Sequence, residues 1–353
     1  MRQLFPVILV FAALAATHSQ TAAAQQWESL RSGTDARLRG LSAVSDTIAW
    51  ASGARGTILR TVDGGRVWQA LTIPGTADLD FRDIDAMSDR VAYVLSIGNG
   101  PASRIYKTTD GGQTWALQFR NADASAFFDA MAFWDEQRGI AISDSIGGRF
   151  VIIRTLDGGA TWTPVPAAAL PPALDNEGAF AASGTNVAVF GKEHVWIGTG
   201  AAARARVLRS TDAGATWTLA ETPLAAGPSA GIYSIAFRDA RHGIIVGGDY
   251  AKEAEAVDNA AVTSDGGRTW KPAKGLSGYR SVVASLPGGR GRSQIWLAIG
   301  PTGADLSSDD GRTWKEVSSL GFDTASVGRA QDGEPVVFAA GANGRLGRLR
   351  FQL

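Results

Sequence analysis

Two short motifs in this sequence match patterns that carry catalysis or cofactor binding. Residues 227–231 read G-P-S-A-G, the G-x-S-x-G pattern of a serine nucleophile on a strand-to-helix turn. Residues 198–203 read G-T-G-A-A-A, which resembles a phosphate-binding loop at the N-terminus of a helix. Both patterns need a helix directly after them. Neither is followed by a helical pattern, so we predict a turn at 227–231 and a strand over 206–210.

The histidine and cysteine content of the sequence does not favour a metal site or thiol chemistry. Beyond residue 24 the only histidines are His194 and His242, 48 residues apart, and the chain has no cysteine. No H-x-x-x-H or C-x-x-C spacing is present, so a zinc site is not expected and neither are disulfide bonds. We predict that the protein needs no metal and no cofactor.

One motif, S/T-x-D-x-G-x-x-W, occurs six times, at 61–68, 108–115, 155–162, 210–217, 263–270 and 307–314. Its tryptophans are 47, 47, 55, 53 and 44 residues apart. A period of about 40–50 residues is that of a four-stranded propeller blade. The repeats therefore predict an all-β propeller, and they specify the fold more than they specify the function.

The aspartates of the motif are predicted to stabilise their own turns. A carboxylate in a D-x-G turn accepts hydrogen bonds from the turn amides, glycine permits positive φ, and the tryptophan packs against the neighbouring sheet. The alternative is a calcium loop, but calcium needs several oxygen ligands and each copy offers one carboxylate. We predict structural roles without metal for Asp63, Asp110, Asp157, Asp212, Asp265 and Asp309.

The first repeat divides into strands at 41–44, 47–52, 57–61 and 68–73, because apolar alternation is broken there by Gly and Asp. Five similar repeats follow, at about 79–120, 127–166, 178–221, 231–273 and 278–318. Residues 321–353 supply three more strands, and 27–30 match a fourth. The two ends together make one blade. We predict seven blades, the last closed by the N-terminal strand, with a six-bladed ring as the alternative.

These motifs make the chain resemble the Asp-box propellers, also called bacterial neuraminidase repeats. T-x-D-G-G-x-x-W in nearly every repeat is most similar to the photosystem II stability/assembly factors and their non-photosynthetic bacterial relatives. The resemblance implies a protein-binding or assembly scaffold. The alternative within the same group is a glycoside hydrolase, which needs two carboxylates about 5–10 Å apart. The R-I-P signature of sialidases is not matched by Arg104-Ile105-Tyr106.

The N-terminus predicts export. Arg2, an apolar run from Pro6 to Ala16 and the small residues before Gln25 form a secretory signal peptide over 1–24, cleaved after Ala24. The run is shorter than the 18–20 or so residues of a membrane span. Removing Arg2 with this segment leaves 33 basic against 34 acidic residues, a net charge of −1, so no nucleic-acid partner is expected. We predict one propeller domain at 25–353, monomeric, without a membrane span, and periplasmic or secreted.

The binding site should lie around the central channel. Loops between strands two and three, and between consecutive blades, share one face, and the motif turns occupy the other. The ligand would be an envelope protein, a peptide or a small polar molecule. Interblade salt bridges and turn caps are the alternative explanation for these polar residues. The first choices are Asp144, Glu177, Asp249 and Arg280, joined by Tyr250, Arg82 and Arg206. Further polar residues on this face are Arg39, Arg55, Asp129, Asn176 and Asp305.

Overall fold

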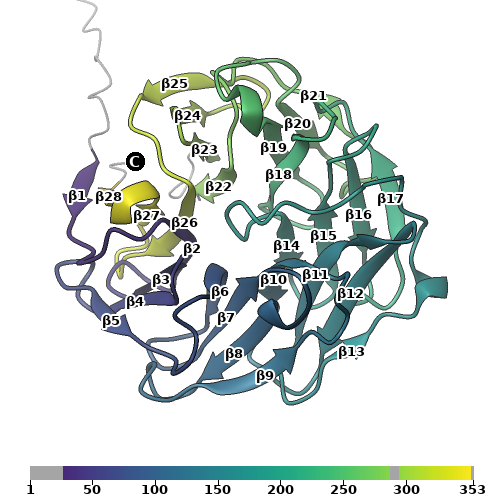
Figure 1. Ribbon diagram of the computed structural model, residues 1–353. Coiled ribbons are helices and arrows are strands. Elements are labelled where there is room, and N and C mark those ends of the chain that lie inside the picture. Colours follow the sequence, from purple (N-terminus) through teal and green to yellow (C-terminus); the bar gives the residue numbers. More distant parts are fainter. Residues whose placement is uncertain (1–26, 287–293, 351–353) are drawn as a thin grey trace, which may run out of the picture.

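The computed structural model describes residues 27–286 and 294–350. The predicted signal peptide therefore lies outside the described residues. The strands form seven four-stranded antiparallel sheets, arranged as blades of a ring (Figure 1). The all-β, seven-bladed prediction is confirmed, and the six-bladed alternative is wrong.

The first three blades follow one another along the chain, each running from the channel outward. Blade 1 contains β2 (Leu38–Ala43), β3 (Ala49–Gly53), β4 (Thr57–Thr61) and β5 (Gln69–Leu71). Blade 2 contains β6 (Asp80–Ala86), β7 (Ala92–Ile97), β8 (Arg104–Thr108) and β9 (Ala116–Arg120). Blade 3 contains β10 (Phe128–Phe133), β11 (Gly139–Ile146), β12 (Arg149–Thr155) and β13 (Thr163–Pro164).

The next three blades repeat this order. Blade 4 contains β14 (Val187–Phe190), β15 (His194–Gly198), β16 (Arg206–Ser210) and β17 (Thr218–Glu221). Blade 5 contains β18 (Ala230–Phe237), β19 (Gly243–Asp249), β20 (Ala260–Thr263) and β21 (Lys271–Pro272). Blade 6 contains β22 (Val282–Leu286), β23 (Ile295–Gly300), β24 (Gly303–Ser307) and β25 (Lys315–Ser318).

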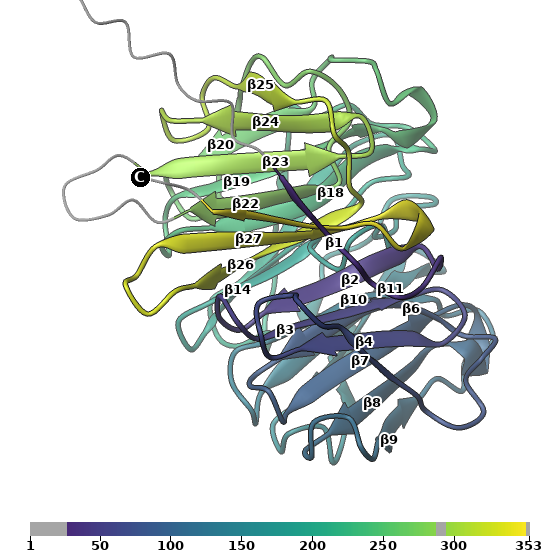
Figure 2. The same cartoon turned by 90° about the vertical axis from the view of Figure 1, so that its left-hand side faces the viewer.

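Blade 7 joins the two ends of the chain. It contains β26 (Thr324–Arg329), β27 (Pro335–Ala340), β28 (Leu346–Arg350) and, as its outer strand, β1 (Glu28–Leu30). β1 pairs antiparallel with β28, with Ser29 opposite Gly347 (Figure 1). Figure 2 shows β1 from the side, close to β27 of the same blade. Trp27 packs on Phe322 with ring centroids 4.8 Å apart. The predicted closure between the termini is confirmed.

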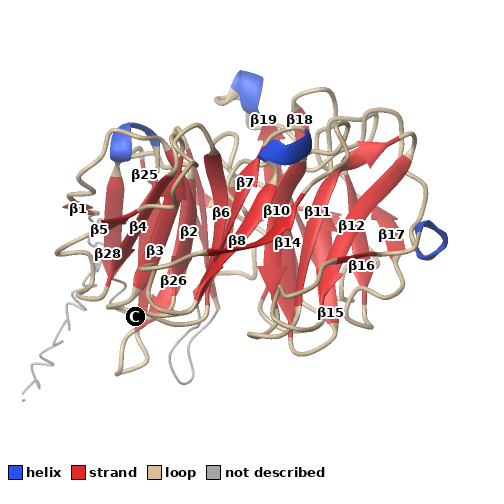
Figure 3. Ribbon diagram, turned by 60° about the horizontal axis from the view of Figure 1, so that its bottom comes forward, coloured by secondary structure: helices blue, strands red, loops and turns tan. Residues whose placement is uncertain are grey.

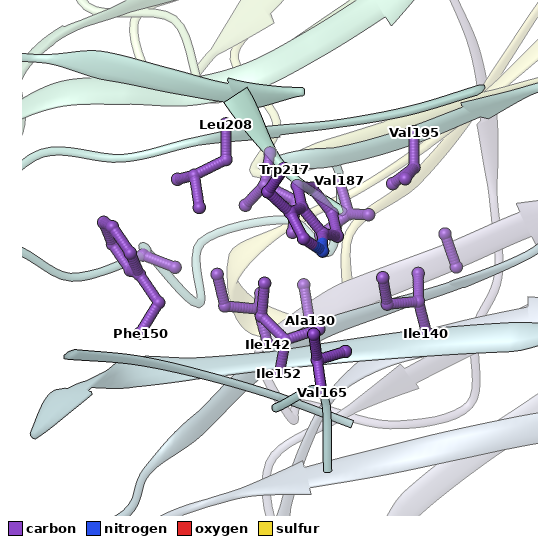
Figure 4. Close-up of a cluster of buried hydrophobic side chains, with 13 residues drawn as sticks. Ala130, Ile140, Ile142, Phe150, Ile152, Val165, Val187, Val195, Leu208 and Trp217 are labelled. Carbon is purple, nitrogen blue, oxygen red and sulfur yellow. The ribbon is translucent and has the colours of Figure 1, made fainter. Parts of the chain in front are cut away.

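The core consists of apolar layers between neighbouring blades. Between blades 3 and 4, for example, Ile142 and Ile152 face Leu208 and Trp217 (Figure 4). Trp217 is a motif tryptophan and is buried. Truncating a buried tryptophan costs about 3–5 kcal/mol, so the four buried motif tryptophans, Trp68, Trp217, Trp270 and Trp314, are main supports of their interblade layers.

The six motif turns are built from one set of hydrogen bonds. In the first, Thr61 Oγ1 donates to Asp63 Oδ1 (2.9 Å), and the Val67 amide donates to the same oxygen (3.0 Å). The Gly65 amide donates to Thr61 Oγ1 (2.9 Å). The Ser or Thr hydroxyl donates to the aspartate in the other five turns as well. The carboxylates therefore hold their own turns together.

The motif turns share one face of the ring with the turns between strands one and two. The amide of the residue directly after the motif aspartate donates to a carbonyl in the turn between strands one and two of its own blade. Examples are Gly64 N to Thr47 O (2.9 Å) and Gly158 N to Gln137 O (2.8 Å). Loops between strands two and three lie on the opposite face, which we call the channel face. Three of them contain 3-10 helices: η1 (Gly100–Ala102), η3 (Tyr250–Lys252) and η4 (Ala342–Gly344), drawn blue in Figure 3. The fourth, η2 (Ala167–Ala169), lies between blades 3 and 4.

The two catalytic-looking motifs lack the helix that each would need. Residues 227–231 run through a short bridge between Gly227 and Ala230 directly into β18. Residues 198–203 lead into β16. Both expectations for these segments are confirmed. The largest boundary error is in the fourth repeat, which was expected to start at 178, whereas its first strand, β14, begins at Val187.

We predict that Asp265→Ala lowers the free energy of unfolding by about 1 kcal/mol, because the amides and hydroxyl of its turn lose their acceptor. Asp265 accepts bonds from Thr263 Oγ1 (2.8 Å) and from the amide and hydroxyl of Thr269 (3.0 and 2.6 Å). Urea unfolding with and without EDTA measures the effect. Ser264→Ala, in the same turn, is the control.

This contribution should also depend on pH. Burial acts to raise the pKa of Asp265, but the hydrogen bonds from Thr269 and Thr263 outweigh it and lower the pKa to about 2. A lowered carboxyl pKa stabilises the fold above about pH 4, and this stabilisation is lost as pH falls toward 2. The difference between wild type and variant should shrink over that interval. A large fall in the wild-type melting temperature on adding EDTA would instead indicate a metal site.

Candidate functional site

Residues 178–186, which precede β14, cross the central channel. Within this segment, Ser183 donates to the Ser281 carbonyl of the blade 6 connection (2.7 Å) and accepts at its own carbonyl from Thr324 of blade 7 (3.1 Å). Arg82 of blade 2 donates to another carbonyl of the segment (3.1 Å). These contacts reach blades on opposite sides of the ring. The segment, not a blade strand, therefore forms the floor of the site.

The first cavity on the channel face, which we call the arginine cavity, has a volume of about 440 Å³. Phe180, Ala181 and Ala182 of the floor segment form part of its wall, so the cavity lies against that segment. The polar and aromatic residues that line it come from blades 1, 2, 5, 6 and 7 and their connections: Arg37, Arg39, Arg82, Tyr233, Tyr250, Glu253, Tyr279, Ser281 and Asp323.

The three arginines of this cavity differ in their partners. Arg37 makes two hydrogen bonds to the Asp323 carboxylate (2.7 and 2.8 Å), which ties blade 1 to blade 7. Arg82 pairs with Asp80 (2.8 Å). Arg39 is half-buried and makes no hydrogen bond or ion pair with any residue that the structure describes. Burial, followed by the charges of Arg82 and Arg37, lowers the pKa of Arg39. Its guanidinium is available for an anionic group.

An aromatic wall stands beside these arginines. Tyr233 stacks on Phe180 with centroids 4.0 Å apart, and Tyr279 meets Tyr233 edge-on at 4.7 Å. Tyr250 meets Tyr233 at 6.2 Å and is 52% exposed. Aromatic faces with a polar tip bind the apolar part of a ligand without losing much rotamer entropy. The arginine cavity thus combines a cationic group with an apolar surface.

A second cavity, of about 410 Å³, adjoins the first and shares Arg82, Phe180 and Ala181 with it. We call it the carboxylate cavity because Asp129 and Asp144 line it. Ala179 N donates to Asp144 Oδ1 (3.1 Å). A Cβ at Gly178 would lie 2.0 Å from the same oxygen, so glycine is required for this approach. Burial raises the pKa of Asp144 to about 6.

Four other residues that the sequence predicted for the site are occupied by the chain itself. Glu177 and Arg206 form a fully buried ion pair, in which Arg206 Nε donates to Glu177 Oε1 (2.9 Å). Arg280 is buried against Asp305 (2.6 Å). Asp249 accepts from the Ala251 amide (2.9 Å) at the start of η3. For these residues the geometry matches the alternative of salt bridges and turn caps.

Of the predicted residues, Arg39, Tyr250, Asp129, Asp144 and Asn176 therefore line the two cavities without an ion-pair partner among the described residues. Arg82 lines both cavities but is paired with Asp80. The sequence reasoning missed Arg37, Tyr233, Tyr279, Glu253 and Asp323. Arg37 and Tyr279 lie just before the first strand of a blade, as the predicted residue Arg280 does, so the same positional rule could have found them. Tyr233 lies within an apolar strand and reads as core. Nothing local marks it as part of a cavity.

Two further classes of site have no support among the described residues. No group of three or more His, Asp or Glu side chains in 27–286 and 294–350 is arranged to hold a metal ion. In the same part of the chain, no helix has the length and apolar character needed to cross a membrane.

The comparisons with known proteins agree with the fold. Residues 19–118 match the family model described as Photosynthesis system II assembly factor YCF48. The resemblance to this family is confirmed. The structure of YCF48 bound to D1 peptide is 17% identical, with a TM-score of 0.62, over 92% of this chain and 95% of that one. YCF48 from Cyanidioschyzon merolae is 18% identical, with a TM-score of 0.60, over 92% and 98%.

Glycosidases share the architecture too. The GH74 enzyme of Niastella koreensis is 15% identical, with a TM-score of 0.54, and the match covers 89% of this chain but 51% of the enzyme. No curated protein sequence matches the chain. At these identities the structural matches show the fold alone, whereas the YCF48 family model rests on the sequence of the first blades.

We predict that Glu177→Gln lowers the free energy of unfolding by about 3 kcal/mol, because it leaves the Arg206 guanidinium buried without a counter-charge. Thermal and urea unfolding measure this loss. The matched control is Glu221→Gln, which breaks the exposed pair with Arg204 (3.1 Å) and should cost less than about 0.5 kcal/mol. Equal effects of the two changes would show that the buried pair does not support blade 4.

Proposed function

We propose that this protein is an exported scaffold that binds a segment of another envelope protein in its arginine cavity. The observation that carries the proposal is Arg39, a half-buried guanidinium without a partner among the described residues, beside the aromatic wall. A buried cation is costly unless it meets an anion. The cavity therefore suits a segment with an acidic residue next to an apolar or aromatic one.

Two further observations support a peptide as the ligand. One of the similar structures is YCF48 bound to D1 peptide, so a protein of similar fold binds a peptide. The cavity also lies on the channel face, against residues 178–186, which form its floor. A segment of a larger protein can enter from that face while the rest of the partner stays outside.

We predict that Arg39→Gln weakens peptide binding about 10- to 100-fold, which corresponds to the loss of a hydrogen-bonded charge pair. An array of immobilised random decapeptides, probed with the purified protein at neutral pH, is the assay. Wild type should select peptides that contain Asp or Glu near an aromatic residue. Arg66→Gln, an exposed change on the opposite face, should bind like wild type. Selection that is unaffected by Arg39→Gln would contradict the proposed site.

The glycoside hydrolase alternative is tested with the same proteins. A panel of chromogenic glycosides is incubated with wild type and with Asp144→Asn. The scaffold proposal expects no turnover by either protein. Turnover by wild type that is abolished in the Asp144 variant would replace the scaffold with a glycosidase.

Export is the other part of the proposal, and it rests on the signal-peptide pattern of residues 1–24. Cell fractionation followed by mass spectrometry of the purified protein should find it in the periplasm or the medium. Its N-terminus should lie at or near Gln25. An intact form that starts at Met1 and stays in the cytoplasm would contradict export without affecting the binding site.

A further inference from the structure

The two cavities of the channel face are neighbours that carry opposite charges on their walls. Both use Arg82, Phe180 and Ala181 as wall. Arg39 stands in the first cavity, and Asp129 and Asp144 stand in the second. Arg82 lies at the boundary, held by Asp80 and by the Ala181 carbonyl. A ligand that spans this boundary meets a cation on one side and carboxyl groups on the other.

The two carboxyl groups differ from three other buried acids of the channel face. Glu177, Asp305 and Asp323 each face an arginine at ion-pair distance. Neither Asp129 nor Asp144 has an ion pair with any described residue. Asp129 is only 2% exposed, and its Oδ2 has no hydrogen-bond partner there. An acid buried in this way is costly unless a donor reaches it.

We infer that the carboxylate cavity binds a basic side chain of the same segment whose acidic side chain binds at Arg39. This inference rests on the proposed function and adds the class of ligand: a dipolar segment, with an acid and a lysine or arginine a few residues apart. An ammonium group supplies three donors, and Asp144, Asp129, Ser145 and Asn176 supply oxygen acceptors on the cavity wall. The opposite charges also determine in which direction the segment lies.

The contribution of the basic side chain should increase with pH. Burial raises the pKa of Asp144 to about 6, and burial followed by the charge of Asp144 raises the pKa of Asp129 well above its usual range. The charged groups that face them are Arg82 of blade 2 and the pair that Glu177, in the connection before blade 4, forms with Arg206 of blade 4. A bound cation favours the ionised carboxylates, so binding strengthens as pH rises through about 6.

The test uses four sets of fluorescein-labelled synthetic peptides with Glu next to Phe and with Lys one to four residues further along. One set keeps both charges, the second has Gln for Lys, the third has Gln for Glu, and the fourth has both changes. Fluorescence anisotropy measures Kd between pH 5 and 8. At the best spacing, the doubly charged peptide should bind wild type at least tenfold more tightly than either singly charged one. The gain from Lys should rise with pH.

Two variants separate the two ends of the site. Asp144→Asn keeps an oxygen for the Ala179 amide, and it should remove most of the gain from Lys while leaving the gain from Glu. Arg39→Gln should do the reverse, and Arg66→Gln should change neither. Circular dichroism melting confirms that each variant is folded.

The possible results distinguish this inference from the proposed function. If Glu strengthens binding and Lys does not at any spacing, the dipolar ligand is overturned and the scaffold proposal stands. A gain from Lys that survives Asp144→Asn places the basic group elsewhere and also overturns the inference. If no peptide of the four sets binds wild type, both the inference and the proposed binding site are overturned.

Discussion

The pairing of β1 with β28 is the constraint on which the ring depends. Three residues of the N-terminus, Glu28 to Leu30, complete a sheet whose other strands come from the last 30 or so residues described. Without that strand, blade 7 would present the polar edge of β28 to solvent, and such edges recruit other chains. Closure also makes every blade an internal one, because blade 7 then packs between blades 6 and 1. The chain has no disulfide bond to replace this function.

A closed ring leaves a channel, and the way it is filled determines the site. Residues 178–186 form hydrogen bonds with blades on opposite sides of the ring. They therefore cross the channel and form a floor for the two cavities. The same segment provides Phe180 to the aromatic wall and Gly178 to the approach of Asp144. One stretch of chain therefore shapes both the apolar surface and the acidic end of the site.

The charges of the channel face fall into two groups with different physical roles. Arg206 with Glu177 and Arg280 with Asp305 are buried pairs, in which one partner lies in a blade strand and the other in the connection before that blade, and each partner compensates the other. Arg39 and Asp144 line the cavities without such partners. Low-dielectric surroundings make both arrangements energetically important, but only the unpaired groups have unsatisfied interactions to offer a ligand. This distinction, and not the number of charges, identifies the binding surface.

The sequence by itself determined the architecture. Six motif turns, with tryptophans 44 to 55 residues apart that pack between blades, predict the repeats. Trp27 followed by a strand pattern predicts the closure. The face on which the motif turns lie also followed from the repeat, since the order of strands within a blade decides on which face each loop emerges. These features are local or periodic, so they can be read along the chain.

Only the tertiary structure decided which polar residues are available to a ligand. Glu177 and Asp144 look alike in sequence, but one is paired with Arg206, which is 29 positions away, and the other is unpaired. Tyr233 reads as a core residue until Phe180 crosses the channel to stack on it. The path of residues 178–186 depends on contacts with blades 2, 5, 6 and 7, and each of these lies far away in the chain. Contacts between residues that only ring closure brings together produce no periodic or local pattern in the sequence. For this reason the sequence could predict the face that carries the site, but not which residues form it.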